Sequence, residues 1–415
     1  AAYNAEPTVF TLENEKVAIT FTSRGAQPSQ VMIKDYMTAD SSELYLMKEG
    51  MSEMSFQLYS NQYVSTENFT YSLVGQSDSS LVFRLAFSDN SYIEHQYKLS
   101  PESYMLDFNI NMVGMDRVVP RNASQLDMEW VMDIPRLEKG YENEKSYSTI
   151  VYKYPGEKSV DNLGLRKESA DKNLTTKVEW VAFQQQFFSA ILLAENNFES
   201  TRLNMSFYPE TDNQKRLMHC SADGSIFFDA APQLTIPLKF YFGPNQYKEL
   251  KSHGYSFEKI VPLGKNIIGW INRFVIIPLF DLFNGFISNY GIIILLMTII
   301  IKLVVSPMTI KSYMSSAKMN VLKPEIDKIN AKYPKEQDAM KKQQEIMALY
   351  QKAGVSMFGG CLPMLLQFPI LIAMFRFFPA SIELRQQPFL WAEDLSTYDS
   401  IVNFGFNVPL LGDHI

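Results

Sequence analysis

Residues 291–305 read Gly291-Ile-Ile-Ile-Leu-Leu-Met-Thr-Ile-Ile-Ile-Lys302-Leu-Val-Val305, an apolar run that carries one full positive charge. A charge at membrane depth costs roughly 2.5–3.5 kcal/mol on insertion scales, so such a residue usually faces a polar cavity or a partner. Thr298 and Ser306 lie four residues before and after Lys302, so a helix would project all three from one face. Two interpretations remain open. The three residues form a polar stripe, or Lys302 lies near the helix end and its ammonium reaches the headgroups.

The chain as a whole divides into two unlike halves. Residues up to about 250 are polar and strand-like, whereas residues from about 264 are rich in Ile, Leu, Met and Phe. The net charge of −7 gives no basic excess of the kind that binds nucleic acid, and we expect no direct sequence-specific contact with it. Cys220 and Cys361 are too far apart to indicate a disulfide framework or a thiolate metal site, and the four histidines show no ligand spacing. We therefore expect no metal and no cofactor.

Residues 1–250 alternate apolar and polar side chains in short runs. Examples are Leu81–Phe87, Met105–Met112 and Leu234–Phe242. Alternation with period two, bounded by Asn, Asp, Ser, Gly and Pro, is typical of half-buried antiparallel strands. Many such strands predict a large antiparallel β-sandwich. Only the stretch around Phe183–Ile191 could instead form an amphipathic helix, and no catalytic signature is found, so we expect no catalytic residue.

Residues 251–284 form a linker and an amphipathic stretch with Trp270 and basic residues, interrupted by Pro278. This pattern suits a helix lying in the membrane interface, although a connector helix packed on protein would look similar. Residues 285–305 have the length of a spanning helix, and residues 358–380 form a second candidate span. Gln367 in the second span is expected to face inward, or else to bond a neighbouring helix.

Residues 306–357, between the two spans, are rich in lysine, and short basic loops stay in the cytoplasm. This places residues 1–250 and 381–415 on the outer side. Apolar residues spaced 3, 4, 3, 4 predict one helix of a pair, and Pro334 marks the turn to the returning helix. We therefore expect a cytoplasmic helical hairpin. The apolar positions of the first helix are Met319, Leu322, Ile326, Ile329 and Tyr333.

The first residue is Ala1, with no export signal, and the chain ends after the apolar stretch Ile401–Leu411. An outer domain requires an export signal or an N-terminal span. We expect an N-terminal anchor and further C-terminal spans outside this chain.

Several motifs resemble the YidC family of membrane protein insertases in order and spacing. They are Trp180-Val-Ala182, Phe242-Gly-Pro244, Ser306-Pro-Met-Thr309, Leu322-Lys-Pro324, Met347-Ala-Leu-Tyr350, Gly359-Gly-Cys-Leu-Pro363, Gln367-Phe-Pro369, Glu383-Leu-Arg385 and Asp394-Leu-Ser396. Each is weak alone, but the ordered set is specific.

The resemblance implies a periplasmic sandwich with a mutarotase-like fold and five core spans around a hydrophilic groove. A basic residue that is often arginine lines this groove in the family, and its position falls on Lys302. The lysine keeps the charge but loses the bidentate fork of arginine. Only two of the five spans are in this chain.

The sequence thus predicts an insertase and chaperone of the bacterial inner membrane, multi-pass, with a large periplasmic domain. Its expected partners are nascent membrane-protein substrates and the lipid bilayer, with the Sec translocon and the ribosome as further candidates. The expected groove residues are Lys302, Thr298, Ser306 and Gln367. Two alternatives are a transporter or channel subunit, which would need more charges in the spans, and a membrane-tethered carbohydrate-processing domain, which would need carboxylates and histidines gathered in one groove.

Overall fold

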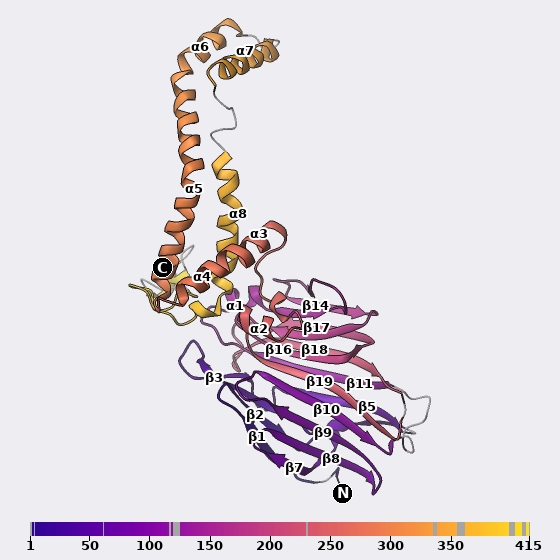
Figure 1. The fold of residues 1–415 in the computed structure, drawn as a ribbon. Helices are drawn as coiled ribbons and strands as arrows, with labels where there is room; N and C mark the ends of the chain where they lie inside the picture. Colours follow the sequence, from indigo (N-terminus) through magenta and orange to yellow (C-terminus); the bar gives the residue numbers. More distant parts are fainter. Residues whose placement is uncertain are drawn as a thin grey trace. The chain divides into compact units, whose positions relative to one another are not determined.

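The computed structural model describes residues 2–3, 5–60, 62–115, 118, 125–229, 231–334, 338–354, 362–397, 403–408 and 412–414. The chain forms two compact units, Ala1–Val261 and Pro262–Ile415, shown as strands and helices in Figure 1. The first consists mainly of β-strands and the second mainly of helices.

The first unit is an antiparallel β-sandwich, as the alternating pattern predicted. Its sheets have the strand orders β1-β2-β3-β4, β13-β12-β15-β16-β19-β10-β9-β8-β7 and β14-β17-β18-β11-β5-β6. The region Phe183–Ile191 lies in strands β15 and β16, so the helical alternative for it is wrong. The strands are β1 (Val9–Glu13), β2 (Val17–Thr22), β3 (Gln27–Met37), β4 (Glu43–Met47), β5 (Ser52–Ser60), β6 (Gln62–Ser65), β7 (Ser72–Ser77), β8 (Ser80–Ser88), β9 (Ser91–Leu99), β10 (Met105–Val113), β11 (Gln125–Pro135), β12 (Thr149–Lys153), β13 (Asp161–Asn162), β14 (Ser169–Leu174), β15 (Val178–Gln184), β16 (Phe188–Phe198), β17 (Ser200–Phe207), β18 (Arg216–Phe227) and β19 (Gln233–Pro244).

Aromatic side chains fill the core between the two larger sheets. Trp130 of β11 stacks on Phe183 of β15 with ring centroids 4.1 Å apart, and this pair joins the six-stranded sheet to the nine-stranded sheet. Along β10 every second residue is buried, which is the pattern of a strand with one face in the core. The sandwich therefore buries its apolar faces without lipid.

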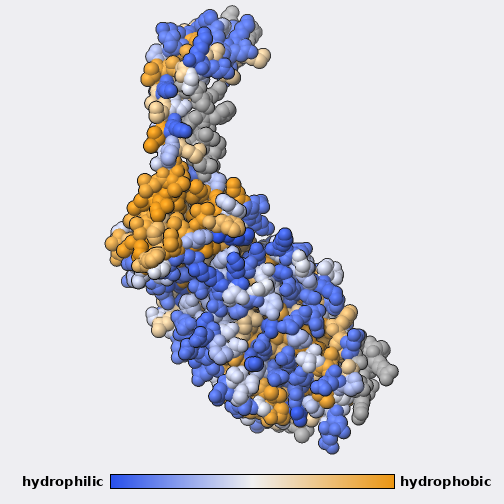
Figure 2. Space-filling view, viewed as in Figure 1, coloured by the Kyte–Doolittle hydropathy of each residue, from blue (hydrophilic) through white to orange (hydrophobic). Residues whose placement is uncertain are grey.

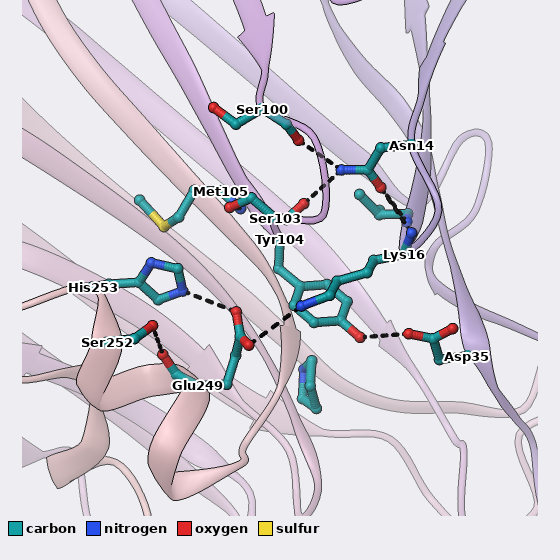
Figure 3. Close-up of polar contacts among 12 residues, drawn as sticks. Asn14, Lys16, Asp35, Ser100, Ser103, Tyr104, Met105, Glu249, Ser252 and His253 are labelled. Carbon is teal, nitrogen blue, oxygen red and sulfur yellow. Dashed lines mark hydrogen bonds and ion pairs between the residues drawn. The ribbon is translucent and has the colours of Figure 1, made fainter.

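A short helix, α2 (Tyr247–Ser252), is fixed to the sandwich by the polar network of Figure 3. The Glu249 carboxylate lies 3.4 Å from Lys16 Nζ and 3.3 Å from His253 Nε2. The Tyr104 hydroxyl beside them donates to Asp35 at 3.2 Å. Past α2, Phe257 and Ile260 are buried, and Trp180 Nε1 donates to the Tyr255 carbonyl at 3.0 Å. The first unit therefore ends at Val261, later than the predicted boundary at 250, because this tail completes its core.

The second unit begins with a continuous helical run, Asn266–Asn284. It comprises α3 (Asn266–Ile271), a π-helical turn (Asn272–Ile276) and α4 (Ile277–Asn284). Pro278 does not end this run, but the regular α-helix gives way to a π turn immediately before it. Proline lacks an N–H, and its ring would clash with the carbonyl four residues earlier; the wider π turn just before Pro278 relieves that clash.

A 32-residue helix, α5 (Tyr290–Val321), follows. Residues 290–305 of the predicted span 285–305 lie in this helix, and residues 306–321, assigned to the hairpin, continue it. Pro307 lies inside α5 instead of ending it. Beyond it come α6 (Lys323–Lys332), α7 (Ala339–Lys352) and α8 (Leu362–Phe377), which packs beside α5 (Figure 1). The remaining elements are α1 (Tyr141–Tyr147) in the first unit and β20 (Asn403–Val408) and β21 (Gly412–His414) in the second.

By length and composition, two described helices could cross a membrane, Asn266–Asn284 and Tyr290–Val321, with mean hydropathies of 1.4 and 2.4. The apolar helical run Gln367–Ala380 is shorter. Figure 2 shows apolar side chains gathered around α3, α4 and the beginning of α5, and mainly hydrophilic side chains over α6 and α7.

Candidate functional site

The polar stripe predicted on the first span lies on α5. Asn289 caps the helix, since its side chain accepts a hydrogen bond from the Ile292 N–H at 3.1 Å. Thr298 and Lys302 are exposed and Ser306 is half-buried. The spacing of four residues places the three side chains along one side of α5, next to the face that buries Met297 and Val305.

Ser306 compensates for the proline that follows it. Pro307 has no N–H, so the carbonyl of Leu303 loses its usual helical donor. The Ser306 hydroxyl donates to that carbonyl at 2.8 Å. The Thr298 hydroxyl likewise donates to the Ile294 carbonyl at 2.8 Å. In this structure both hydroxyl protons are used within the helix, and each oxygen keeps lone pairs that can accept a hydrogen bond.

Lys302 lies well inside α5, which continues to Val321. With a rise of about 1.5 Å per residue, its backbone is about 18 Å from Tyr290, whereas the hydrocarbon core of a bilayer is about 30 Å thick. Lys302 therefore does not lie at the end of α5, whereas the interpretation that its ammonium reaches the headgroups stays open. Among the described residues no carboxylate pairs with its ammonium. Its neighbours Ile299, Leu303 and Val304 are exposed and apolar.

Gln367, the fourth predicted groove residue, lies on α8 and is half-buried. Helices α5 and α8 are in contact. Within the described part of the chain, no hydrogen bond joins Gln367 to Lys302, Thr298 or Ser306. The structure thus brings the three α5 residues into one stripe and leaves Gln367 on the neighbouring helix. The motif Gly359-Gly-Cys-Leu-Pro363 lies outside the described side chains.

Helices α6 and α7 contact each other through Glu345. Its carboxylate accepts from Lys332 Nζ and from the Tyr333 hydroxyl, both at 2.7 Å. These bonds hold the pKa of Glu345 below its usual value, the bond from Lys332 having the larger effect. No side chain of α6 or α7 is fully buried, so the predicted apolar seam is at most half-covered in this chain.

Two features of the helical unit were not predicted from sequence. Asn272 is fully buried, and its Nδ2 donates to the Leu263 carbonyl at 2.7 Å. A β-carbon built at Gly291 would lie 2.0 Å from Cγ of Phe389, so the phenyl ring packs directly on the α5 backbone. The sequence gives only a weak signal for the first, because Asn272 is followed by the polar Arg273 and lies six positions before a proline. Nothing local signals the second, because Phe389 is distant in sequence.

Comparison with known proteins gives two family matches that cover nearly the whole chain. The YidC periplasmic domain family matches residues 9–280, and the family described as 60Kd inner membrane protein matches residues 282–412. The chain is 44% identical to the membrane protein insertase YidC of Phocaeicola vulgatus, over 98% of this chain and 66% of that protein. It is 42% identical to the protein of the same name from Bacteroides fragilis and 36% identical to that from Amoebophilus asiaticus, over 66% and 68% of their lengths.

Solved structures similar to the chain include a galactose mutarotase related enzyme from Lactobacillus acidophilus. That likeness has a TM-score of 0.37 at 10% identity, over 57% of this chain and 97% of the enzyme. A galactose mutarotase-like protein from Lactobacillus casei gives the same TM-score at 11% identity, over 57% of this chain and all of that one. We build no argument on a likeness at this score.

Proposed function

The chain belongs to the YidC family, and we propose that it takes part in inserting and folding proteins of the bacterial inner membrane, with Lys302 supplying a positive charge within the membrane. The chain spans about two thirds of the length of the Phocaeicola and Bacteroides relatives, so the proposal concerns the whole protein. In this proposal the sandwich is periplasmic and α5 and α8 are two of several spans.

The observation that carries the proposal is the position of Lys302. It lies about 18 Å along an apolar helix, at a depth where a lone ammonium is costly, with no carboxylate partner among the described residues. Water or an acidic ligand beside such a charge would lower the free-energy cost of keeping it within the membrane. Thr298, Ser306 and Gln367 would supply polar groups along the same path. Further spans outside this chain would have to enclose it.

The proposed mechanism is physical and breaks no covalent bond. The hydrophilic tail of a substrate must cross an apolar slab, and a wet, charged recess part-way through shortens the dry path. Lys302 would attract acidic tails as a diffuse charge, since an ammonium lacks the planar fork that pairs a carboxylate bidentately. The apolar segment of the substrate would then enter the lipid along the apolar side of α5. This transfer would be favoured by a free energy of about 25 cal/mol per Å² of apolar surface removed from water.

The orientation of the spans rests on the lysines of α6 and α7. Lys328, Lys332 and Lys341 are exposed there, and basic segments beside spans stay in the cytoplasm. Helices α6 and α7 would then be a cytoplasmic hairpin that meets nascent substrates and the ribosome. The Sec translocon is a further candidate partner within the membrane.

The test uses the full-length protein in inverted membrane vesicles, with small substrates that carry acidic or neutral outer tails. Lys302→Ala should reduce insertion of the acidic-tailed substrate at least tenfold, whereas Lys302→Arg should retain it. Lys311→Ala removes an exposed lysine from the same helix and is the matched control. Normal insertion by Lys302→Ala, or an equal loss in Lys311→Ala, would refute the role of Lys302.

A second measurement tests whether Lys302 faces water. A cysteine placed there, in a background with Cys361→Ser, should react with a membrane-impermeant thiol reagent added to inverted vesicles. A cysteine at Val304, which is exposed on the side of α5 opposite Lys302, should resist the same reagent. Equal resistance at both positions would mean that Lys302 faces lipid.

A further inference from the structure

Two exposed apolar sites, called the two tips below, lie at the start of α5: Phe286 and the Leu390–Trp391 turn. Phe286 lies in the turn that joins α4 to α5 and is 83% exposed. Leu390 and Trp391 are 75% and 82% exposed, at the tip of a tight turn that Phe389 and Ala392 close with backbone hydrogen bonds of 2.9 and 3.0 Å. Leu390 has a φ of 55°, a left-handed conformation unusual for a γ-branched residue. The turn therefore holds two large apolar side chains outward at a conformational cost.

Contacts within the helical unit place both tips at the same end of α5. Phe389, the residue before Leu390, packs on Gly291 in the first turn of the helix. Phe286 precedes the capping residue Asn289 by three positions. Phe280, in the middle of α4, stacks on Tyr290 with ring centroids 5.8 Å apart. The two tips therefore lie at the level where α5 begins.

The apolar surface continues from this level along α5. The exposed apolar residues there are Ile292, Leu295 and Ile299. The tips therefore lie at the edge of a long apolar surface. On the other side of the turn, Glu393 is exposed and Asp394 accepts from the N–H and hydroxyl of Ser396, both at 2.8 Å. Bulky aromatic residues between an apolar surface and a polar edge are typical of the membrane–water interface.

We propose that Phe286 and the Leu390–Trp391 turn form an interfacial anchor, which inserts into the boundary between headgroups and acyl chains at the end of α5 capped by Asn289. This inference rests on the proposed function only in taking α5 as a membrane span. The occupant of this surface is lipid. The Gly291–Phe389 contact fixes the turn to α5, so the anchor sets the depth at which α5, and with it Lys302, sits in the bilayer.

The experiment uses the full-length protein with its other cysteines replaced, reconstituted in phosphatidylcholine–phosphatidylglycerol vesicles. A single cysteine at Trp391, Phe286, Glu393 or Val304, which is exposed on the side of α5 opposite Lys302, is labelled with an environment-sensitive fluorophore. Quenching is compared between lipids with a nitroxide near the headgroup and lipids with a nitroxide deep in the acyl chain. Labels at Trp391 and Phe286 should be quenched at least twice as strongly by the shallow nitroxide, and the label at Val304 by the deep one. The exposed Glu393 position is the matched control and should be quenched by neither.

The outcomes separate the anchor from the span. If Val304 is quenched by the deep nitroxide but Trp391 and Phe286 by neither, α5 spans the membrane and the anchor is refuted, whether another protein segment or water covers the tips. If Val304 is also unquenched, α5 is not a span and the proposed function fails with the anchor. Strong deep quenching at Trp391 would also overturn the anchor, because the turn would then be buried among acyl chains.

Discussion

Glu249 and Lys16, at opposite ends of the β-sandwich sequence, place their carboxylate and ammonium 3.4 Å apart. His253 holds the other oxygen of the same carboxylate at 3.3 Å. The contact with Lys16 attaches α2 to the start of the strand that begins at Val17, whereas the contact with His253 lies at the end of α2 itself (Figure 3). Both side chains are less than a third exposed, so solvent screens the pair only in part.

Replacing Glu249 by Gln should lower the free energy of unfolding of the first unit by about 1–2 kcal/mol at pH 7, the usual worth of charge-assisted bonds. The bond from His253, and after it the charge of Lys16, lowers the pKa of Glu249. A lowered carboxyl pKa stabilises the fold above the unfolded value of 4.5, and this stability is lost as the pH falls through the folded pKa. The difference between wild type and variant, measured by urea unfolding, should therefore vanish in acid. A difference that is constant with pH would contradict this account.

His95 gives a second pH dependence. Burial lowers its pKa from 6.5 to about 4, although Nδ1 lies 3.0 Å from the Ala26 carbonyl. As the pH falls, His95 is protonated in the unfolded chain before it is protonated in the folded one. The free energy of unfolding therefore carries no penalty from His95 above pH 6.5, and it declines by about 3 kcal/mol as the pH falls to 4. His95→Phe should remove this decline. The ring would lie among Phe56, Tyr71 and Phe108, and the Tyr97 hydroxyl would still donate to Ala26.

Glu144 makes the free energy of unfolding depend on pH in the opposite direction. Burial first, and then the charge of Glu138, raises its pKa from 4.5 to about 8, so it is mostly neutral at pH 7. A raised carboxyl pKa stabilises the fold fully below pH 4.5, and this stability is lost as the pH rises through 8. Between pH 4.5 and 6.5 the slopes of His95 and Glu144 should cancel. Glu144→Gln should therefore become more stable with rising pH in that window, and His95→Phe less stable. Parallel curves for the two variants would refute both assignments.

The tail that follows α2 should be part of the independently folding β-unit. A fragment of residues 1–261 should be soluble and unfold cooperatively. A fragment of residues 1–250 should be less stable by about 3 kcal/mol or more, since it lacks the buried Phe257 and Ile260. Phe257→Ala in the longer fragment is the matched control and should give most of the difference. Equal stability of the two fragments would return the boundary to residue 250.

Removing helices α6 and α7 should separate structure from activity. A protein in which a flexible linker replaces residues 322–353 should still reach the membrane, because α5 and α8 pack without them. Its insertion rate should fall at least fivefold. The control exchanges Lys332 and Glu345, which preserves their ion pair and should preserve the rate. An unchanged rate in the deletion would reduce α6 and α7 to packing elements.

The features predicted correctly are those that depend on neighbours in sequence. Period-two alternation predicted the antiparallel sandwich, and spacing by four predicted the stripe of Thr298, Lys302 and Ser306. The extent of α5 was not predicted because Pro307 usually ends a helix, and here Ser306 supplies the donor that the Leu303 carbonyl lost. The end of the first unit and the Gly291–Phe389 contact depend on residues far apart in the chain, which one sequence does not pair. The groove roles of Lys302, Thr298, Ser306 and Gln367 remain predictions.

One consequence follows from the length of α5. A single unbroken helix carries Lys302 near its middle and leads, at its far end, into the lysine-rich pair α6 and α7. Only helix lies between Leu322 and the polar stripe, so a displacement of α6 would reach Lys302 through α5 itself. Pro307 lies between them and is the place where α5 bends most easily, so part of such a displacement would be absorbed there.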